Sequence, residues 1–123
     1  MNHIIAIAAG GAVGALLRFS VSTGIYNLLG RGFPYGTLAV NVLGCWLMGF
    51  LSVFMLERFA SVEWRAALLI GLLGAFTTFS TFSLETLNLI ENGELNKALL
   101  NIFISISLCL FATWLGMLLA KQL

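Results

Sequence analysis

In one short segment, residues 76–83, phenyl side chains recur at every third residue, and hydroxyl side chains fill the positions between them. The hydroxyls belong to Thr77, Thr78, Ser80, Thr81 and Ser83, and the rings belong to Phe76, Phe79 and Phe82. A hydroxyl can donate a hydrogen bond to an anion, and a phenyl ring is electropositive at its edge. Neither group carries a fixed charge that would trap the ion. The segment therefore favours weak, reversible anion binding, whereas an aromatic repeat taken alone is more typical of packing.

A second polar face is formed by Thr37 and Asn41, which are four residues apart and would share one side of a helix. Asn41 lies inside an uncharged run, residues 32–56. Its carboxamide offers two donors, which could serve an anion in an ion pathway or a neighbouring helix. Asn101 and Ser105 repeat the spacing, and for them we expect an interhelical hydrogen bond of structural value.

Two charged residues, Arg18 and Glu85, lie within or at the end of apolar segments. An arginine at the centre of a bilayer costs at least about 2.5 kcal/mol, so we expect Arg18 to reach toward one surface. There it could collect anions at a pore vestibule or anchor the helix at the interface. Glu85 could face the same vestibule or the lipid headgroups.

The composition excludes a soluble globular protein. Hydrophobic residues make up 60% of the 123 residues and charged residues 9%, against about a quarter charged in soluble domains. The formal net charge of +1 leaves no basic face for nucleic acid. Cys45 and Cys109 lie within apolar runs, where we expect small core residues rather than a disulfide or a metal pair.

Four apolar segments must position the polar groups, because a membrane helix needs about 20 residues. They span about residues 3–29, 33–56, 65–90 and 97–121. We predict an all-α membrane protein with a single four-helix transmembrane domain over residues 1–123. With no segment left for a catalytic domain, we do not expect an enzyme. A signal peptide is the alternative for the first segment, but no basic stretch precedes it.

Glycines and threonines weaken the third segment near its midpoint. Gly71 and Gly74 precede Thr77, and each glycine costs a helix about 1 kcal/mol relative to alanine. We therefore predict a break in the third helix near the midplane, whose freed carbonyls could bind a cation. Small residues elsewhere predict close helix packing, with one stripe at Gly10 and Gly14 and another at Ala112, Gly116 and Ala120.

Basic residues do not select one orientation in the membrane. One side would hold Arg58, Arg65 and Lys121, and the other Arg31 and Lys97, with Arg18 if it reaches that surface. Because this balance gives no positive-inside bias, the chain could insert both ways and form an antiparallel homodimer. The alternative is that weaker signals select one orientation.

Three segments resemble, in order and spacing, the signature segments of the bacterial fluoride channels of the CrcB/Fluc family. They are GGAVGALLR at residues 10–18, GTLAVNVLG at residues 36–44, and residues 71–82, which contain the most specific run, TTFSTF. The resemblance covers essentially the whole chain. Ala75 stands where such proteins commonly have glycine.

The resemblance implies a multi-pass protein of the bacterial inner membrane that forms an antiparallel, dual-topology homodimer with two fluoride pathways. It assigns Asn41, Phe79, Phe82, Ser80 and Thr81 to the fluoride pathway, and Gly74 and Thr77 to backbone carbonyls that hold a structural sodium ion at the dimer centre. Arg18 matches the arginine of the first signature. Thr37, on the face of Asn41, completes the predicted pathway.

Passive, fluoride-selective export is therefore the function that we expect. The alternative is a proton-coupled transporter of the small multidrug-resistance type, which should carry a carboxylate in its first helix, where this chain has Arg18. A third possibility is an accessory subunit, which would not need the hydroxyl run. Chloride selectivity also stays open, because neutral donors discriminate through pore size.

Overall fold

The computed structural model describes residues 2–58 and 61–123, and every regular element within these ranges is helical. The elements are α1 (Asn2–Leu29), α2 (Tyr35–Glu57), α3 (Val62–Arg65), η1 (Ala66–Leu73), α4 (Gly74–Phe76), α5 (Phe79–Glu91) and α6 (Leu95–Gln122). Within the same ranges, four stretches are long and apolar enough to cross a membrane: Asn2–Leu29, Tyr35–Glu57, Val62–Glu91 and Leu95–Gln122. The prediction of an all-α membrane protein with four spans is confirmed.

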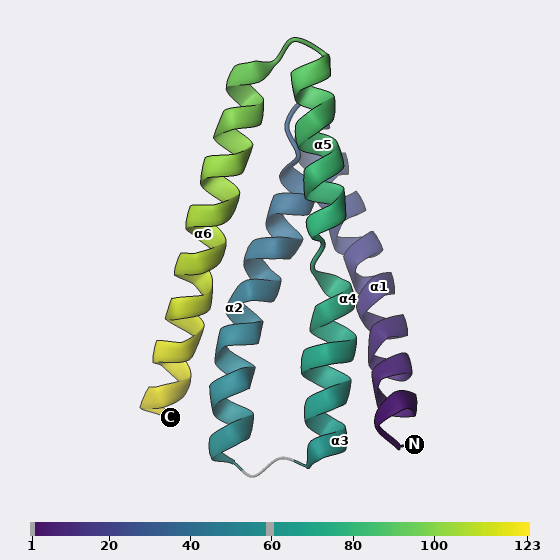
Figure 1. The fold of residues 1–123 in the computed structure, drawn as a ribbon, viewed down its shortest axis with the longest axis vertical. Coiled ribbons are helices and arrows are strands. Elements are labelled where there is room, and N and C mark those ends of the chain that lie inside the picture. The colour runs from purple at the N-terminus through teal and green to yellow at the C-terminus, as the bar shows by residue number, and fades with distance from the viewer. Residues whose placement is uncertain (1, 59–60) are drawn as a thin grey trace.

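The four spans run side by side, and the two ends of the chain lie at the same end of the bundle (Figure 1). Helix α2 packs along α6, while α1 packs along η1 and α4. The third span is assembled from α3, η1, α4 and α5 in succession. It starts at Val62, three residues before the predicted start at residue 65.

Glycines bring the helix backbones into direct contact at both interfaces. A Cβ atom added at Gly10 or Gly14 would collide with backbone carbonyls of η1, at Ala67 and Leu72 respectively. In the second interface, a Cβ at Gly116 would collide with the carbonyl oxygen of Trp46 on α2. Such close approach gives the van der Waals contact that holds helices together in lipid. The two predicted packing stripes are confirmed, since Ala112 and Ala120 are buried in the stripe of Gly116.

The third span departs from a regular α-helix at two places. Residues Ala66–Leu73 form a π-helix, a form that is wider than the α-helix and often occurs near functional sites. After Phe76 the helix stops, because Thr77 and Thr78 have extended backbones with ψ angles of 157° and 117°. A new helix begins at Phe79. Gly71 and Gly74 remain helical, so the interruption lies at the threonines that follow the glycines.

Two turns need glycine for their backbone angles. Gly30 after α1 has a φ of 83°, and Gly93 before α6 has a φ of 79°. L-amino acids with a side chain rarely adopt this left-handed region, which is why glycine ends many helices. These turns place α2 antiparallel to α1 and α6 antiparallel to α5 (Figure 1).

Candidate functional site

The side chain of Asn41 holds the interruption of the third span through two hydrogen bonds. Thr78 N–H donates to Asn41 Oδ1 at 2.7 Å, and Asn41 Nδ2 donates to the Thr78 carbonyl oxygen at 3.0 Å. Both backbone groups of Thr78 are therefore satisfied by a residue of α2, which removes the cost of burying them unpaired. One of the two Asn41 amide hydrogens remains for another acceptor.

Thr78 also begins the next helix. Its hydroxyl accepts a hydrogen bond from Thr81 N–H at 3.2 Å and donates to Thr81 Oγ1 at 3.1 Å. This is the N-cap arrangement in which a threonine side chain replaces the missing helical acceptor.

These hydrogen bonds change the partners of two carbonyl groups. In a continuous helix, Thr78 N–H would bond to the Gly74 carbonyl and Thr81 N–H to the Thr77 carbonyl. Here the first N–H donates to Asn41 and the second to the Thr78 hydroxyl. The carbonyl groups of Gly74 and Thr77 thus lose their helical donors at the middle of the third span.

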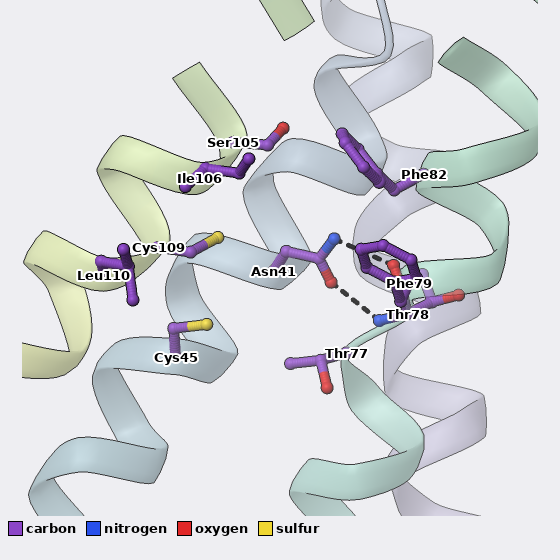
Figure 2. Close-up of a pocket in the computed structure, with 10 residues that line it drawn as sticks. All are labelled: Asn41, Cys45, Thr77, Thr78, Phe79, Phe82, Ser105, Ile106, Cys109 and Leu110. Atoms are coloured by element: carbon purple, nitrogen blue, oxygen red, sulfur yellow. Dashed lines mark hydrogen bonds between the residues drawn. The ribbon is translucent and has the colours of Figure 1, made fainter. Parts of the chain in front are cut away.

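A cavity of about 330 Å³ lies between α2, α6 and the interruption, and we call it the neutral cavity. Its lining residues are Asn41, Cys45, Thr77, Thr78, Phe79, Phe82, Ser105, Ile106, Cys109 and Leu110. Figure 2 shows Asn41 and the two phenyl rings around this space. The Phe79 and Phe82 ring centroids are 5.4 Å apart with an interplanar angle of 44°. The wall thus combines phenyl rings with uncharged dipoles.

A second cavity, of about 250 Å³, lies on the other side of Thr78, and we call it the charged cavity. Arg18, Arg31 and Glu85 contribute to its wall. Glu85 is held by two hydroxyls, since Thr37 Oγ1 donates to Glu85 Oε1 and Tyr26 OH donates to Glu85 Oε2, each at 2.5 Å. The cavity therefore brings two guanidinium groups together with one hydrogen-bonded carboxylate.

Arg31 extends the charged cavity toward the end of the bundle. Its guanidinium carbon lies 4.4 Å from the centroid of the Tyr26 ring, a cation–π contact. Arg31, Tyr26 and Glu85 also line a neighbouring cavity of about 260 Å³ that reaches Asn92 and Glu94 in the turn after α5. The charged groups therefore lie between the turn region and the neutral cavity.

The structure divides the predicted pathway and vestibule residues between the two cavities. Asn41, Phe79 and Phe82 line the neutral cavity, whereas Thr37, Thr81, Arg18 and Glu85 line the charged cavity. Ser80 is exposed and lies 3.4 Å, Oγ to Oγ1, from Thr78. Thr77 lines the neutral cavity, and Gly74 is exposed on the third span.

The interhelical hydrogen bond expected for Asn101 and Ser105 is confirmed for Asn101, whereas Ser105 bonds within its own helix. Asn101 Nδ2 donates to Thr86 Oγ1 at 2.9 Å, and Ser105 Oγ donates to Asn101 Oδ1 at 3.2 Å. The first hydrogen bond joins α6 to α5, the second lies within α6, and all three side chains are buried.

Three residues of the site were given no site role of their own from the sequence, although Thr78 was named among the hydroxyls of residues 76–83 and Arg31 among the basic residues. Thr78 lines both cavities, and its signal was a threonine that precedes a helix start, a common N-cap. Tyr26 and Arg31 line the charged cavity together with Glu85. Their sequence signal was weak, because a tyrosine and an arginine at the end of a membrane span commonly mark only the interface.

Comparisons with known proteins agree with the family resemblance. Residues 5–117 match the family model described as "CrcB-like protein, Camphor Resistance (CrcB)". A protein of Methylococcus capsulatus named "Fluoride-specific ion channel FluC" is 62% identical over 98% of this chain, and the chain spans 53% of that relative's length. Proteins with the same name from Hydrogenovibrio crunogenus and Geobacter sulfurreducens are each 51% identical over 98% and 100% of this chain, which covers 92% and 100% of them.

These names describe ion channels and not enzymes. They also do not favour the proton-coupled transporter that the sequence left as an alternative. In this structure Glu85 on α5 is the carboxylate that lines the charged cavity among the described residues, while α1 contributes Arg18 to the same cavity.

Proposed function

Because this chain belongs to the CrcB-like family, we propose that it is a channel that passively exports fluoride across a bacterial inner membrane. The observation that carries the proposal is the neutral cavity at the interruption of the third span. It offers the free amide hydrogen of Asn41 and the rings of Phe79 and Phe82 at one place. Neutral donors can replace part of an anion's hydration and still release it, as conduction requires.

Two features support the direction of fluoride movement. Hydrogen fluoride is a weak neutral acid that crosses lipid, and it dissociates in a near-neutral cytoplasm, where the anion is trapped. With the cytoplasm negative, the membrane potential favours exit of one anion by about 2.3 kcal/mol per 100 mV. An open pathway is then sufficient for export, without a coupled ion.

The assembly we propose is an antiparallel homodimer of oppositely inserted copies. An interrupted backbone at membrane depth is tolerated only where protein covers it or where it lines a cavity. In the single chain, Phe79 beside the interruption is 77% exposed. A second copy would cover this ring and complete the walls of two pathways. The balance of basic residues between the two sides supports insertion in both orientations.

A structural sodium ion at the dimer centre fits the donor set of this chain. The carbonyl groups of Gly74 and Thr77 have lost their helical donors, and Gly74 is exposed on the third span. Backbone carbonyls of a broken helix are suitable ligands for sodium. Two copies would contribute four such oxygens, and the bound cation would supply positive charge that offsets their mutual repulsion.

The proposed function is tested by fluoride efflux from liposomes that contain the purified protein. We expect selective fluoride efflux over chloride, and at least about 10-fold slower fluoride efflux for Phe79→Ile and Phe82→Ile, because isoleucine lacks the electropositive ring edge. Phe103→Ile is the matched control, since Phe103 on α6 is 73% exposed and is not among the residues that line the neutral cavity. Undiminished efflux in both cavity variants would contradict the placement of the pathway.

Two further measurements test the assembly and the ion. Labelling of the chain termini in cells should find copies in both orientations, and one uniform orientation would contradict the antiparallel dimer. Anomalous scattering or ion replacement should locate a cation at the two-fold axis. Intact dimerisation and fluoride efflux in sodium-free buffer would contradict a structural sodium ion.

A further inference from the structure

Two cysteines from different helices form a pair in the wall of the neutral cavity. Cys45 is on α2 and Cys109 is on α6, and both are free thiols and only half-buried. Their side chains both line the neutral cavity. Figure 2 shows both sulfur atoms pointing to the same side, toward the cavity. From the sequence we expected these two cysteines to be small core residues rather than a metal pair, because each lies within an apolar run.

The backbone around the cysteines fixes their separation. A Cβ atom added at Gly49 would collide with the carbonyl oxygen of Thr113, and one at Gly116 with the carbonyl oxygen of Trp46. The two glycines lie one and two helical turns from the cysteines, so α2 and α6 are in backbone contact there. The Thr113 hydroxyl also donates to the Cys109 carbonyl at 2.9 Å. A rigid pair of donors binds one ion more tightly than two mobile donors because less entropy is lost.

We propose that Cys45 and Cys109 form a two-thiolate site for a soft, filled-shell metal cation such as copper(I), silver(I) or mercury(II). Soft thiolate ligands select these ions, whereas magnesium and calcium prefer oxygen. On binding, the two S–H bonds break, two protons leave to solvent and two metal–sulfur bonds form, so no oxidant is needed. Zinc usually takes four ligands, and the residues described as lining this cavity include no histidine or carboxylate.

Because the pair lines the cavity of the proposed fluoride pathway, a metal bound there would affect transport. This effect rests on the proposed function. Cys45 and Cys109 line the same cavity as Asn41, Phe79 and Phe82. With its two thiolates, the mercury(II) site is neutral and the copper(I) or silver(I) site carries one net negative charge, and in each case the metal occupies part of the space next to the neutral donors. The occupied space would exclude the anion, and fluoride efflux would fall.

Metal binding is tested on the purified full-length chain in detergent, without fluoride, by native mass spectrometry and by titration with mercuric chloride. We expect one mercury per chain with the loss of two hydrogens. Cys45→Ser and Cys109→Ser should each bind at least about 100-fold more weakly, because the second donor no longer acts within the same molecule. Cys45→Ala and Cys109→Ala provide the same comparison if a serine hydroxyl disturbs packing. Equal affinity in the wild-type and single-cysteine chains would overturn the proposal.

The effect on transport is tested separately in proteoliposomes. We expect mercuric chloride to inhibit fluoride efflux through the wild-type protein and not through a Cys45→Ser/Cys109→Ser double variant. Because binding is measured without fluoride, a chain that binds mercury but never conducts fluoride would contradict the proposed function and leave the metal site intact. A chain that conducts fluoride but binds mercury without either cysteine would contradict the metal site alone.

Discussion

The two cavities that meet at Thr78 are built from opposite kinds of groups. The neutral cavity is lined by rings, aliphatic side chains and uncharged dipoles, whereas the charged cavity contains Arg18, Arg31 and Glu85. Among the residues that the structure describes, Thr78 alone lines both. The boundary between them coincides with the interruption of the third span, where the backbone is held by Asn41.

This difference has a physical meaning for an anion that moves between the cavities. Fixed positive charge attracts anions over distances of about 10 Å at 0.1 M salt, but strong binding slows release. Neutral donors act only at contact distance and hold the ion weakly. Under the proposed function, the charged cavity collects fluoride from water and the neutral cavity lets it pass.

The largest effect is expected when a charge is placed in the neutral cavity. Asn41→Asp keeps the acceptor for Thr78 N–H but loses the donor to the Thr78 carbonyl, and it adds a carboxylate at membrane depth. A charge in this setting costs at least about 2.5 kcal/mol, which corresponds to roughly 70-fold slower fluoride efflux. Fluoride efflux from proteoliposomes is the measurement.

The matched control for this substitution is Asn96→Asp. Asn96 is an exposed residue at the start of α6 and lines neither the neutral nor the charged cavity. It undergoes the same change of side chain, and we expect wild-type efflux. If Asn41→Asp also conducted fluoride at the wild-type rate, the neutral character of the cavity would have no role in transport.

The next effect concerns the carboxylate of the charged cavity. Thr37 is 4% exposed and donates to Glu85, so Thr37→Val leaves the carboxylate with one hydroxyl fewer. A hydrogen bond to a charged group contributes about 1.5–3 kcal/mol, and we expect a loss of about 2 kcal/mol in the free energy of unfolding, measured by denaturant titration in detergent. Thr37→Ser keeps the hydroxyl and should stay close to wild type. Equal losses in both variants would show that the methyl group, not the hydrogen bond, stabilises this region.

A smaller effect is expected from one of the two positive charges. Arg18→Gln removes a guanidinium from the charged cavity, and one charge at about 4 Å in water contributes about 1 kcal/mol. We expect roughly fivefold slower efflux at low fluoride concentration. The difference should disappear near 1 M salt, where the Debye length is only about 3 Å. Arg65→Gln is the control, because α3 lies at the opposite end of the third span from α5 (Figure 1). A loss that persists at high salt would contradict attraction at a distance.

The spans and packing stripes could be predicted from the sequence because their signals are local. An apolar run of sufficient length predicts a membrane span. A repeat of small residues, such as Gly10 and Gly14, predicts close packing against another helix. The glycines of the third span were more ambiguous. Gly71 is helical and serves close packing, since a Cβ there would press on the Ile7 carbonyl of α1. The non-helical residues are Thr77 and Thr78 instead.

The partners within the site could not be predicted, because they come from different spans. Asn41 bonds to Thr78, 37 residues away, and Glu85 bonds to Tyr26, 59 residues away. Glu85 was expected to face the vestibule or the headgroups, and for Asn41 the sequence showed that a partner was needed, since buried polar groups are paired. It did not show which one, because helix-face arguments relate only residues three or four apart.

The smallest effect should come from a hydroxyl that lines the neutral cavity but already has a partner. Ser105 Oγ donates to Asn101 Oδ1, and Asn101 keeps its hydrogen bond to Thr86 when Ser105 is changed. Ser105→Ala should therefore cost no more than about 1 kcal/mol of unfolding free energy and should leave fluoride efflux unchanged. Denaturant titration and the liposome assay measure the two quantities. Efflux reduced tenfold or more, with stability retained, would mean that the Ser105 hydroxyl turns toward the ion. The pathway would then use α6 as well as the α2 and α5 wall, and the neutral cavity would bind the anion from both sides.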